Sequence, residues 1–314
     1  TTAGTFPLLP EVNLRSGLRS VGGLVFFVAS DPVHGEELWV TDGTPGGTRL
    51  VVEIVAGEDR PDIAGMTAFK GRLYFWAHGE DYASPTLWTS DGSAAGTFEV
   101  VDPDRFYPDS DFLVEHAGRL WFFATDRATN RSGLWSTDGS AAGTSMAVEL
   151  ADDLRPTHFV SAGSRLFFAA GVFGGESGLW VTDGTPAGTR RLSSSLFQPN
   201  HQEMVGFNGS LYFRSLETST LWKSDGTEAG TTELRDRNGQ PIRLTGAYHP
   251  SGFRAFAGRV YFVNEVGALV ESDGTPAGTS VILEKAGPEL LAVGERLFFR
   301  HYDRATGHEL WVLE

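Results

Sequence analysis

The chain has 314 residues, of which 40% are hydrophobic and 12% aromatic, enough apolar material for a large core. Its formal net charge of −15 argues against nucleic acid and anionic membrane surfaces as partners, because both require a basic contact surface. It has no cysteine, which excludes disulfides and thiolate sites, and no apolar run long enough to span a membrane, so no membrane span is expected.

Three sequence markers recur in chain order. A G-R-L-Y-F-like marker begins at Gly23, Gly71, Gly118, Ser164, Gly209, Gly258 and Glu295. A Leu-Trp pair ends at Trp39, Trp88, Trp135, Trp180, Trp222 and Trp311, with Leu269-Val270 in the sixth copy. A D-G-[TS] marker has its aspartate at Asp42, Asp91, Asp138, Asp183, Asp225 and Asp273, at intervals of 49, 47, 45, 42 and 48 residues. A period near 45 residues indicates a repeat architecture.

Each repeat predicts four short strands. In the second copy these are residues 63–69, 72–78, 85–90 and 98–102, which are rich in aromatic and β-branched residues and bounded by Gly, Asp and Pro. No sustained helical periodicity interrupts them. The predicted fold is all-β, a seven-bladed β-propeller of four-stranded antiparallel blades.

The seventh repeat is divided between the two ends of the chain. "HELWV" at residues 308–312 stops before its D-G-T element, and "TTAGT" at residues 1–5 aligns with the end of that element. We therefore expect residues 4–9 to pair with the strand containing Leu310 and Trp311, as a molecular clasp that removes an open sheet edge. The predicted single domain, 1–314, has approximate blades 13–56, 57–103, 104–151, 152–197, 198–237, 238–285 and 286–314 completed by 1–12.

The repeated stretch from Glu37 to Thr44, with its counterparts, resembles the bacterial ELWxxDGT repeat family over essentially the whole chain. The resemblance implies a propeller-like secreted or cell-surface protein and says little about activity. Ala268 and Val270 depart from the motif in the sixth copy. The placement of the motif is also similar to the Asp-box hairpins of sialidase-type propellers, from which only a structural analogy is taken. No signal peptide is recognised in this chain.

The D-G-T element has two interpretations. Calcium loops use Asp and Gly at short spacing, but each copy here supplies a single carboxylate. The alternative is a hairpin turn in which Asp accepts local N–H bonds, Gly adopts positive φ and Thr caps the turn. The sequence favours the turn, with the Leu-Trp pair as a packing anchor.

Function is expected on the variable loops that join strands two and three of each repeat and that join one repeat to the next, on the face opposite the D-G-T turns. Rigid scaffolds usually carry function on such loops. Seven of the eight histidines are assigned to this loop set, together with exposed aromatic and arginine side chains suited to sugars or peptides. The predicted ligand-binding residues are His34, His78, Tyr82, Tyr107, Arg155, His158, Asn200, His201, Tyr248, His249 and Tyr302.

A narrower hypothesis concerns the innermost strands. A proline is expected just before six of them, at Pro61, Pro108, Pro156, Pro199, Pro250 and Pro288, which places polar residues at the mouth of a central channel. The candidates for acid–base catalysis there are His158, His201, His249 and Tyr248. His158 and His201 with Glu203 are weak candidates for a divalent metal, and no other cofactor is predicted.

Three functions remain open. The first is a monomeric binding propeller for a carbohydrate, peptide or small molecule, and the second is a lyase or hydrolase acting at the channel mouth. The third is a structural module of a surface array. No familiar hydrolase or nucleotide-binding motif decides between them.

Overall fold

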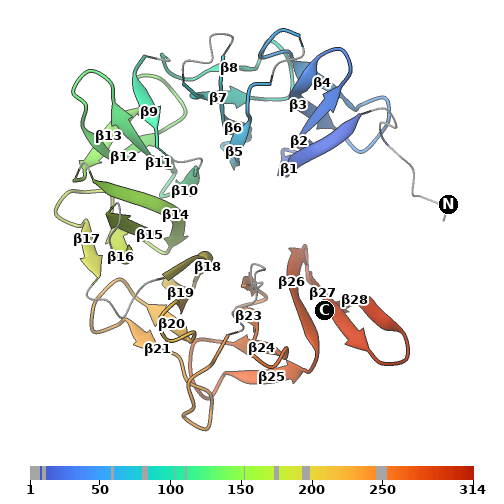
Figure 1. The fold of residues 1–314 in the computed structure, drawn as a ribbon, viewed down its shortest axis with the longest axis vertical. Helices are drawn as coiled ribbons and strands as arrows, with labels where there is room; N and C mark the ends of the chain where they lie inside the picture. Colours follow the sequence, from blue (N-terminus) through green and yellow to red (C-terminus); the bar gives the residue numbers. More distant parts are fainter. Residues whose placement is uncertain are drawn as a thin grey trace. The chain divides into compact units, whose positions relative to one another are not determined.

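The computed structural model describes residues 8, 12–57, 60–79, 84–102, 104–109, 112–151, 153–172, 177–192, 199–244 and 253–314. Every regular element in these ranges is a β-strand, and among them no helix is long and apolar enough to cross a membrane. The chain divides into two compact units, Thr1–Asp152 and Asp153–Glu314 (Figure 1).

Within its described residues the first unit contains three antiparallel sheets, in which neighbouring strands follow one another in chain order. The first sheet is β1 (Asn13–Val21), β2 (Leu24–Asp31), β3 (Gly35–Thr41) and β4 (Arg49–Val52). The second is β5 (Ala64–Phe69), β6 (Arg72–Ala77), β7 (Thr86–Ser90) and β8 (Phe98–Glu99). In the third, β9 (Phe106–Pro108) and β10 (Val114–His116) both pair with β11 (Arg119–Asp126), followed by β12 (Ser132–Thr137) and β13 (Ser145–Glu149).

The second unit contains four sheets of the same design. The first two are β14 (Leu154–Ala162), β15 (Arg165–Val172), β16 (Ser177–Thr182) and β17 (Arg190–Leu192), then β18 (Pro199–Phe207), β19 (Ser210–Ser215), β20 (Leu221–Ser224) and β21 (Thr232–Glu233). The third is β22 (Arg254–Phe256), β23 (Arg259–Val263), β24 (Leu269–Ser272) and β25 (Ser280–Leu283). The last has three strands within the described residues, β26 (Ala286–Val293), β27 (Arg296–Asp303) and β28 (Gly307–Leu313).

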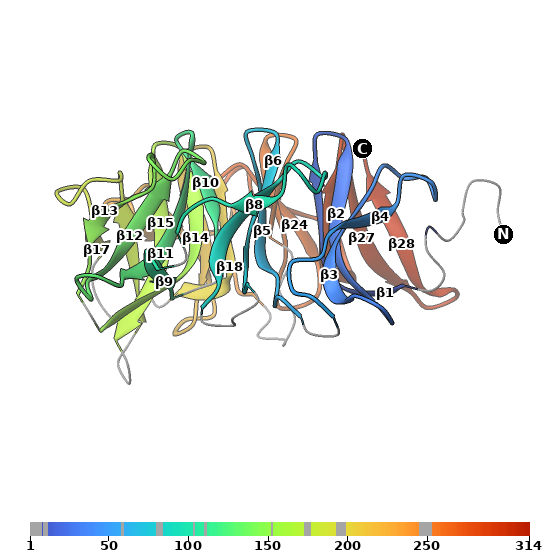
Figure 2. The same cartoon turned by 90° about the horizontal axis from the view of Figure 1, so that it is seen from above.

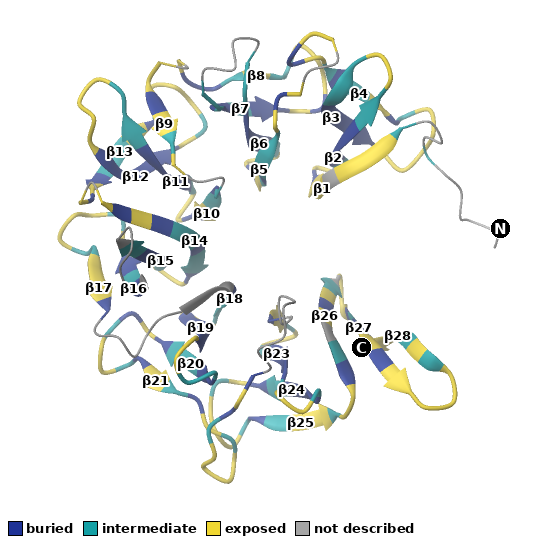
Figure 3. Cartoon of the chain, viewed as in Figure 1, coloured by how far each residue is buried: buried dark blue, intermediate teal, exposed yellow. Residues whose placement is uncertain are grey.

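The core of each unit lies between successive sheets. Phe26 and Leu38 of the first sheet pack against Phe75 of the second, and all three are fully buried. Aromatic residues of the G-R-L-Y-F markers are therefore inter-sheet core, as the sequence predicts. The dark blue residues of Figure 3 mark this core along the middle strands of each unit.

The first strands of the sheets differ from the prediction. Pro156 and Pro288 lie inside β14 and β26 rather than before them. Both strands are edge strands of their sheets, where proline is tolerated at positions whose N–H would face away from the neighbouring strand. Register shifts interrupt β1, β5, β14, β18 and β26, and β14 and β26 begin two residues before the prolines that the sequence predicts to precede them.

The longer strands change where the histidines sit. His158, His201, His301 and His308 lie within strands rather than in the loops to which the sequence assigns them. Residues 4–9, apart from Leu8, lie outside the described part of the chain, so the expected pairing with β28 stays a prediction.

Candidate functional site

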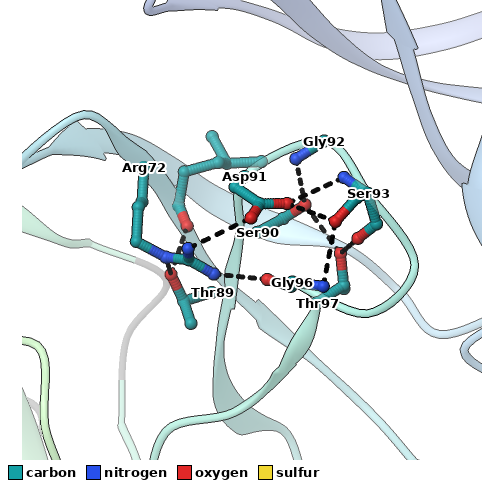
Figure 4. Close-up of polar contacts among 9 residues, drawn as sticks. Arg72, Thr89, Ser90, Asp91, Gly92, Ser93, Gly96 and Thr97 are labelled. Carbon is teal, nitrogen blue, oxygen red and sulfur yellow. Dashed lines mark hydrogen bonds and ion pairs between the residues drawn. The ribbon is translucent and has the colours of Figure 1, made fainter.

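The D-G-[TS] hairpins are built around their aspartate side chain, as Figure 4 shows for the second sheet. Asp91 Oδ1 accepts hydrogen bonds from the Ser93 backbone N–H (2.8 Å) and hydroxyl (2.7 Å). Gly96 N–H donates to Ser93 Oγ (3.0 Å), and Thr97 Oγ1 donates to the Ser93 carbonyl (2.7 Å). These bonds hold the pKa of Asp91 below its ordinary value, with the Ser93 hydroxyl as the largest cause. The carboxylate thus serves its own turn.

The second glycine of the motif is required by the same carboxylate. A Cβ added at Gly96 would lie 2.1 Å from Asp91 Oδ1, and the counterparts Gly47, Gly143, Gly188, Gly230 and Gly278 face their own aspartates at 2.0–2.1 Å. The repeated motif is therefore a backbone turn in all six copies, as the sequence favours.

Basic side chains from other parts of the repeat also bond to the D-G-[TS] hairpins, which together form the hairpin edge of the sheets. Arg72 of the G-R-L-Y-F marker donates to the Gly96 carbonyl of its own sheet, and Arg119 donates to Gly143 in the same way (2.5 Å). Between sheets, Arg49 Nη1 donates to the Gly92 carbonyl (2.6 Å) and Lys70 Nζ donates to the Asp138 carbonyl (3.0 Å). The polar groups of this hairpin edge are largely occupied by bonds within the fold.

The opposite edge of the first unit, here called the loop edge, is formed by the β2–β3 and β6–β7 connections and the segments that lead from one sheet to the next, and it carries polar side chains that pair with one another. Figure 2 shows the sheets of this unit from the side. In the β2–β3 turn, His34 Nδ1 lies 2.8 Å from Asp31 Oδ2, while Asp31 Oδ1 accepts the backbone N–H groups of Val33 and His34. The hydrogen bond raises the pKa of His34 and lowers the pKa of Asp31. An imidazole held by Nδ1 leaves Nε2 for a ligand or proton.

Asp31 belongs to a shallow cleft of about 590 Å³ on this loop edge. The cleft is also lined by Arg15, Ser30, Pro32, Gly35, Glu36 and Arg60. In the next sheet, His78 Nδ1 lies 3.9 Å from Asp62 Oδ2, and Arg60 Nε lies 3.7 Å from Asp62 Oδ1. His34 and His78 therefore each stand beside an aspartate in neighbouring sheets.

Tyr107 on β9 is an exposed aromatic residue of this loop edge, with 44% of its surface accessible. The Arg127 guanidinium lies 4.0 Å from its ring centroid and pairs with Asp104 at 3.5 Å. Arg127 Nε is buried and has no hydrogen-bond partner among the described residues. An exposed phenol ring held by a guanidinium suits stacking and forked hydrogen bonding.

The predicted site residues of the second unit do not converge on one described pocket. Arg155 is exposed and donates to the Leu154 carbonyl, and His158 is half-buried in a left-handed conformation (φ 47°) at the β14 bulge. Tyr302 is 43% exposed and its ring lies 5.1 Å from that of His308. Asn200 and His201 lie on β18, and their side chains are outside the described part, as are Tyr82, Tyr248 and His249.

The candidate metal ligand Glu203 has a different role in the structure. Its carboxylate lies 2.8 Å from Arg214 Nη1, with both side chains more than nine-tenths buried. A buried carboxylate needs such a counter-charge. Within the described residues no group of three potential metal ligands is found.

Asp31 and Asp104 are not among the residues that the sequence indicates for a site, although the D-P-V-H-G turn pattern is a local signal for Asp31. Asp62 follows Pro61 in the pattern that predicts polar residues at the channel mouth, but its pairing with His78 is not predicted.

No family model and no curated protein matches the chain. Among solved structures it is similar to a puromycin hydrolase, with a TM-score of 0.58 and 17% identity over 95% of this chain and 52% of that one. It is also similar to the β-propeller domain of the Trilobed protease from Pyrococcus furiosus (TM-score 0.53, 12% identity, 97% and 96% covered) and to the computationally designed Ika8 protein (0.56, 12%, 95% and 83%). The chain spans about half the length of the hydrolase. At these identities the likeness shows the fold alone, an all-β propeller type.

Proposed function

We propose that this chain is a binding propeller that recognises a carbohydrate or protein surface through its variable-loop edge. The observation that carries the proposal is the exposed Tyr107 ring with Arg127 beside it. A phenol ring stacks on the apolar face of a sugar or on a peptide side chain, while guanidinium groups donate to oxygens. The Asp31–His34 pair adds a positioned imidazole at the same edge.

The test compares two aromatic–arginine pairs on opposite edges of the first unit. Glycan-array screening followed by calorimetry would identify a ligand and then measure it with Tyr107→Ala and Phe98→Ala. Phe98 is also exposed (50%) and lies beside Arg72 (5.5 Å), but directly follows a D-G-S hairpin. We expect Tyr107→Ala to weaken binding about tenfold or more and Phe98→Ala to change it less than twofold.

Equal losses in the two variants, or silence across glycans and surface proteins, would count against the binding proposal. Turnover of the ligand, lost in His34→Ala, would instead support the second candidate, a hydrolase or lyase. The observation favouring that candidate is the carboxylate-held imidazole of His34.

The finer fold belongs to the same proposal. The seven sheets would form one seven-bladed ring, with residues 4–9 completing the last sheet, in a monomeric, secreted or cell-surface protein of the ELWxxDGT type. Its support is the sequence pattern and the exposure of β28, where Leu310 is 75% accessible while its counterpart Leu38 is fully buried. The propeller domain of the Trilobed protease has an open velcro topology, so an open ring is the alternative.

A further inference from the structure

Residues 235–244, here called the strap, form an additional segment after β21, the last strand of its sheet in the second unit (orange in Figure 1). Its turn is fixed by Asp236, whose Oδ1 accepts the backbone N–H groups of Asn238 (2.9 Å) and Gln240 (2.8 Å). The returning half bonds to its own sheet, since Leu221 N–H donates to the Ile242 carbonyl (2.9 Å). The strap is therefore a fixed part of the fold rather than a loose loop.

The strap also joins the neighbouring sheet. Leu244 forms an antiparallel bridge with Asn264, and Glu265 N–H donates to the Arg243 carbonyl (3.0 Å). Between the strap, the β23–β24 turn and β25 lies a cleft of about 290 Å³. This size is at the lower end of small-molecule sites and suits two or three peptide residues.

The cleft combines an apolar surface with two exposed guanidinium groups, whose charge is balanced by the carboxylates of Asp236 and Glu265 in the same lining. Val266 and Val281 line it with 76% and 53% of their surfaces accessible, above the buried Ile242 and Val270. Exposed aliphatic side chains gathered in a cleft favour an apolar ligand group.

Two arginines, Arg237 and Arg243, line the same cleft and are exposed. Neither side chain has a hydrogen bond or ion pair within the described part of the chain, whereas the adjacent Arg235 pairs with Glu233 at 2.8 Å. The carboxylate of Asp236 is already bonded to the turn, and Glu265 is the other acid of the lining. Guanidinium groups bind carboxylates through paired donors.

We infer that this strap cleft is a second binding site, which takes a peptide segment with an aliphatic side chain next to a carboxylate. The aliphatic group lies against Val266 and Val281, and Arg237 and Arg243 bind the carboxylate. The carboxylate comes either from a peptide C-terminus or from an acidic side chain. This site is distinct from the loop edge of the first unit and does not depend on the function proposed there.

Calorimetry with three short peptides tests the inference and separates the two sources. The probes are acetyl-Ala-Val-Leu with a free C-terminus, the same peptide as its C-terminal amide, and acetyl-Val-Asp-Leu amide. We expect at least one carboxylate peptide to bind about tenfold more tightly than acetyl-Ala-Val-Leu amide. A free C-terminus is the source if the first peptide binds best, and an acidic side chain if the third does.

The matched variants are Arg243→Gln, Arg237→Gln and Arg304→Gln. Arg304 is also exposed and has no partner among the described residues, but lies in the β27–β28 turn. Loss of a charge-assisted pair should weaken binding roughly 10- to 100-fold in the first two variants and leave it unchanged in the third. Tyr107→Ala should also leave it unchanged. Binding of the neutral amide equal to that of the acids, insensitivity to both cleft variants, or no binding at millimolar peptide would overturn the inference.

Discussion

At the residue scale, Glu37 shows how one position of the repeat acquires a special property. Its Oε1 accepts the backbone N–H groups of Ile54 (2.9 Å) and Val55 (3.0 Å), while Oε2 is buried and has no partner among the described residues. Burial raises the pKa of this carboxyl to about 7 from its ordinary 4.5. Between pH 4.5 and 7 the Glu37 carboxyl binds more protons in the folded protein than in the unfolded chain. The protonated carboxyl therefore adds to the free energy of unfolding, fully so below pH 4.5, and this contribution is lost as the pH rises through 7.

We predict that Glu37→Gln removes this pH dependence, because the amide oxygen keeps both backbone bonds without a charge to bury. From pH 5 to pH 8 the variant should gain stability relative to the parent by at most about 3 kcal/mol, measured by urea unfolding. Glu309 occupies the same motif position, but it is only partly buried and its pKa is lowered by the Trp311 indole N–H. Glu309→Gln should show no such gain, and a pH-independent difference for Glu37→Gln would contradict the assignment.

At the element scale, the hairpins permit a matched pair of substitutions within one turn. Gly46 has no atom within 4 Å of an added Cβ, whereas an added Cβ at Gly47 would meet Asp42 Oδ1 at 2.1 Å. Gly47→Ala should cost about 1–3 kcal/mol by displacing the carboxylate, while Gly46→Ala should be neutral or stabilise by up to about 1 kcal/mol. Thermal unfolding of both variants measures this, and equal melting temperatures would show that the aspartate does not organise the turn.

The strands and hairpins follow from local patterns, which is why the sequence predicts them well. The Asp91 turn depends on residues within six positions of one another, and the aromatic markers are short apolar runs that are buried on both faces of their strands. The bulge at His158 and the strap cleft depend on contacts between separate strands and sheets, for which one sequence gives no local signal. The sequence predicts Tyr107 as a ligand-binding residue, but its neighbour Asp104 and the Arg127 contact emerge only from the pairing of β9 with β11.

At the scale of the whole molecule, the exposure of β28 bears on the proposed closure of the ring. Leu310 and Val312 of β28 are 75% and 45% accessible, while their counterparts Leu38 and Val40 in the first sheet are 0% and 1% accessible. In the first sheet an outer strand follows Thr48 and pairs Arg49 with Val40. If Thr5 is aligned with Thr48, Phe6 takes the place of Arg49 and should lie opposite Val312. The expected closure can therefore be tested by asking whether Phe6 and Val312 lie opposite each other.

The sequence contains no cysteine, so the two introduced thiols are the only ones that can form a disulfide. Opposed residues of an antiparallel pair have Cα atoms about 4.5–5.5 Å apart, within disulfide range. We predict that Phe6→Cys with Val312→Cys forms an intramolecular disulfide on mild oxidation, detected by intact mass and a gel shift. The control, Leu9→Cys with Val312→Cys, is out of register by three residues, roughly 10 Å, and should remain reduced. A bond that forms only between two molecules would mean that copies exchange their first strands. Failure of the in-register pair to exceed the control would leave the ring open, because the last sheet would then lack the strand that its exposed leucine and valine require.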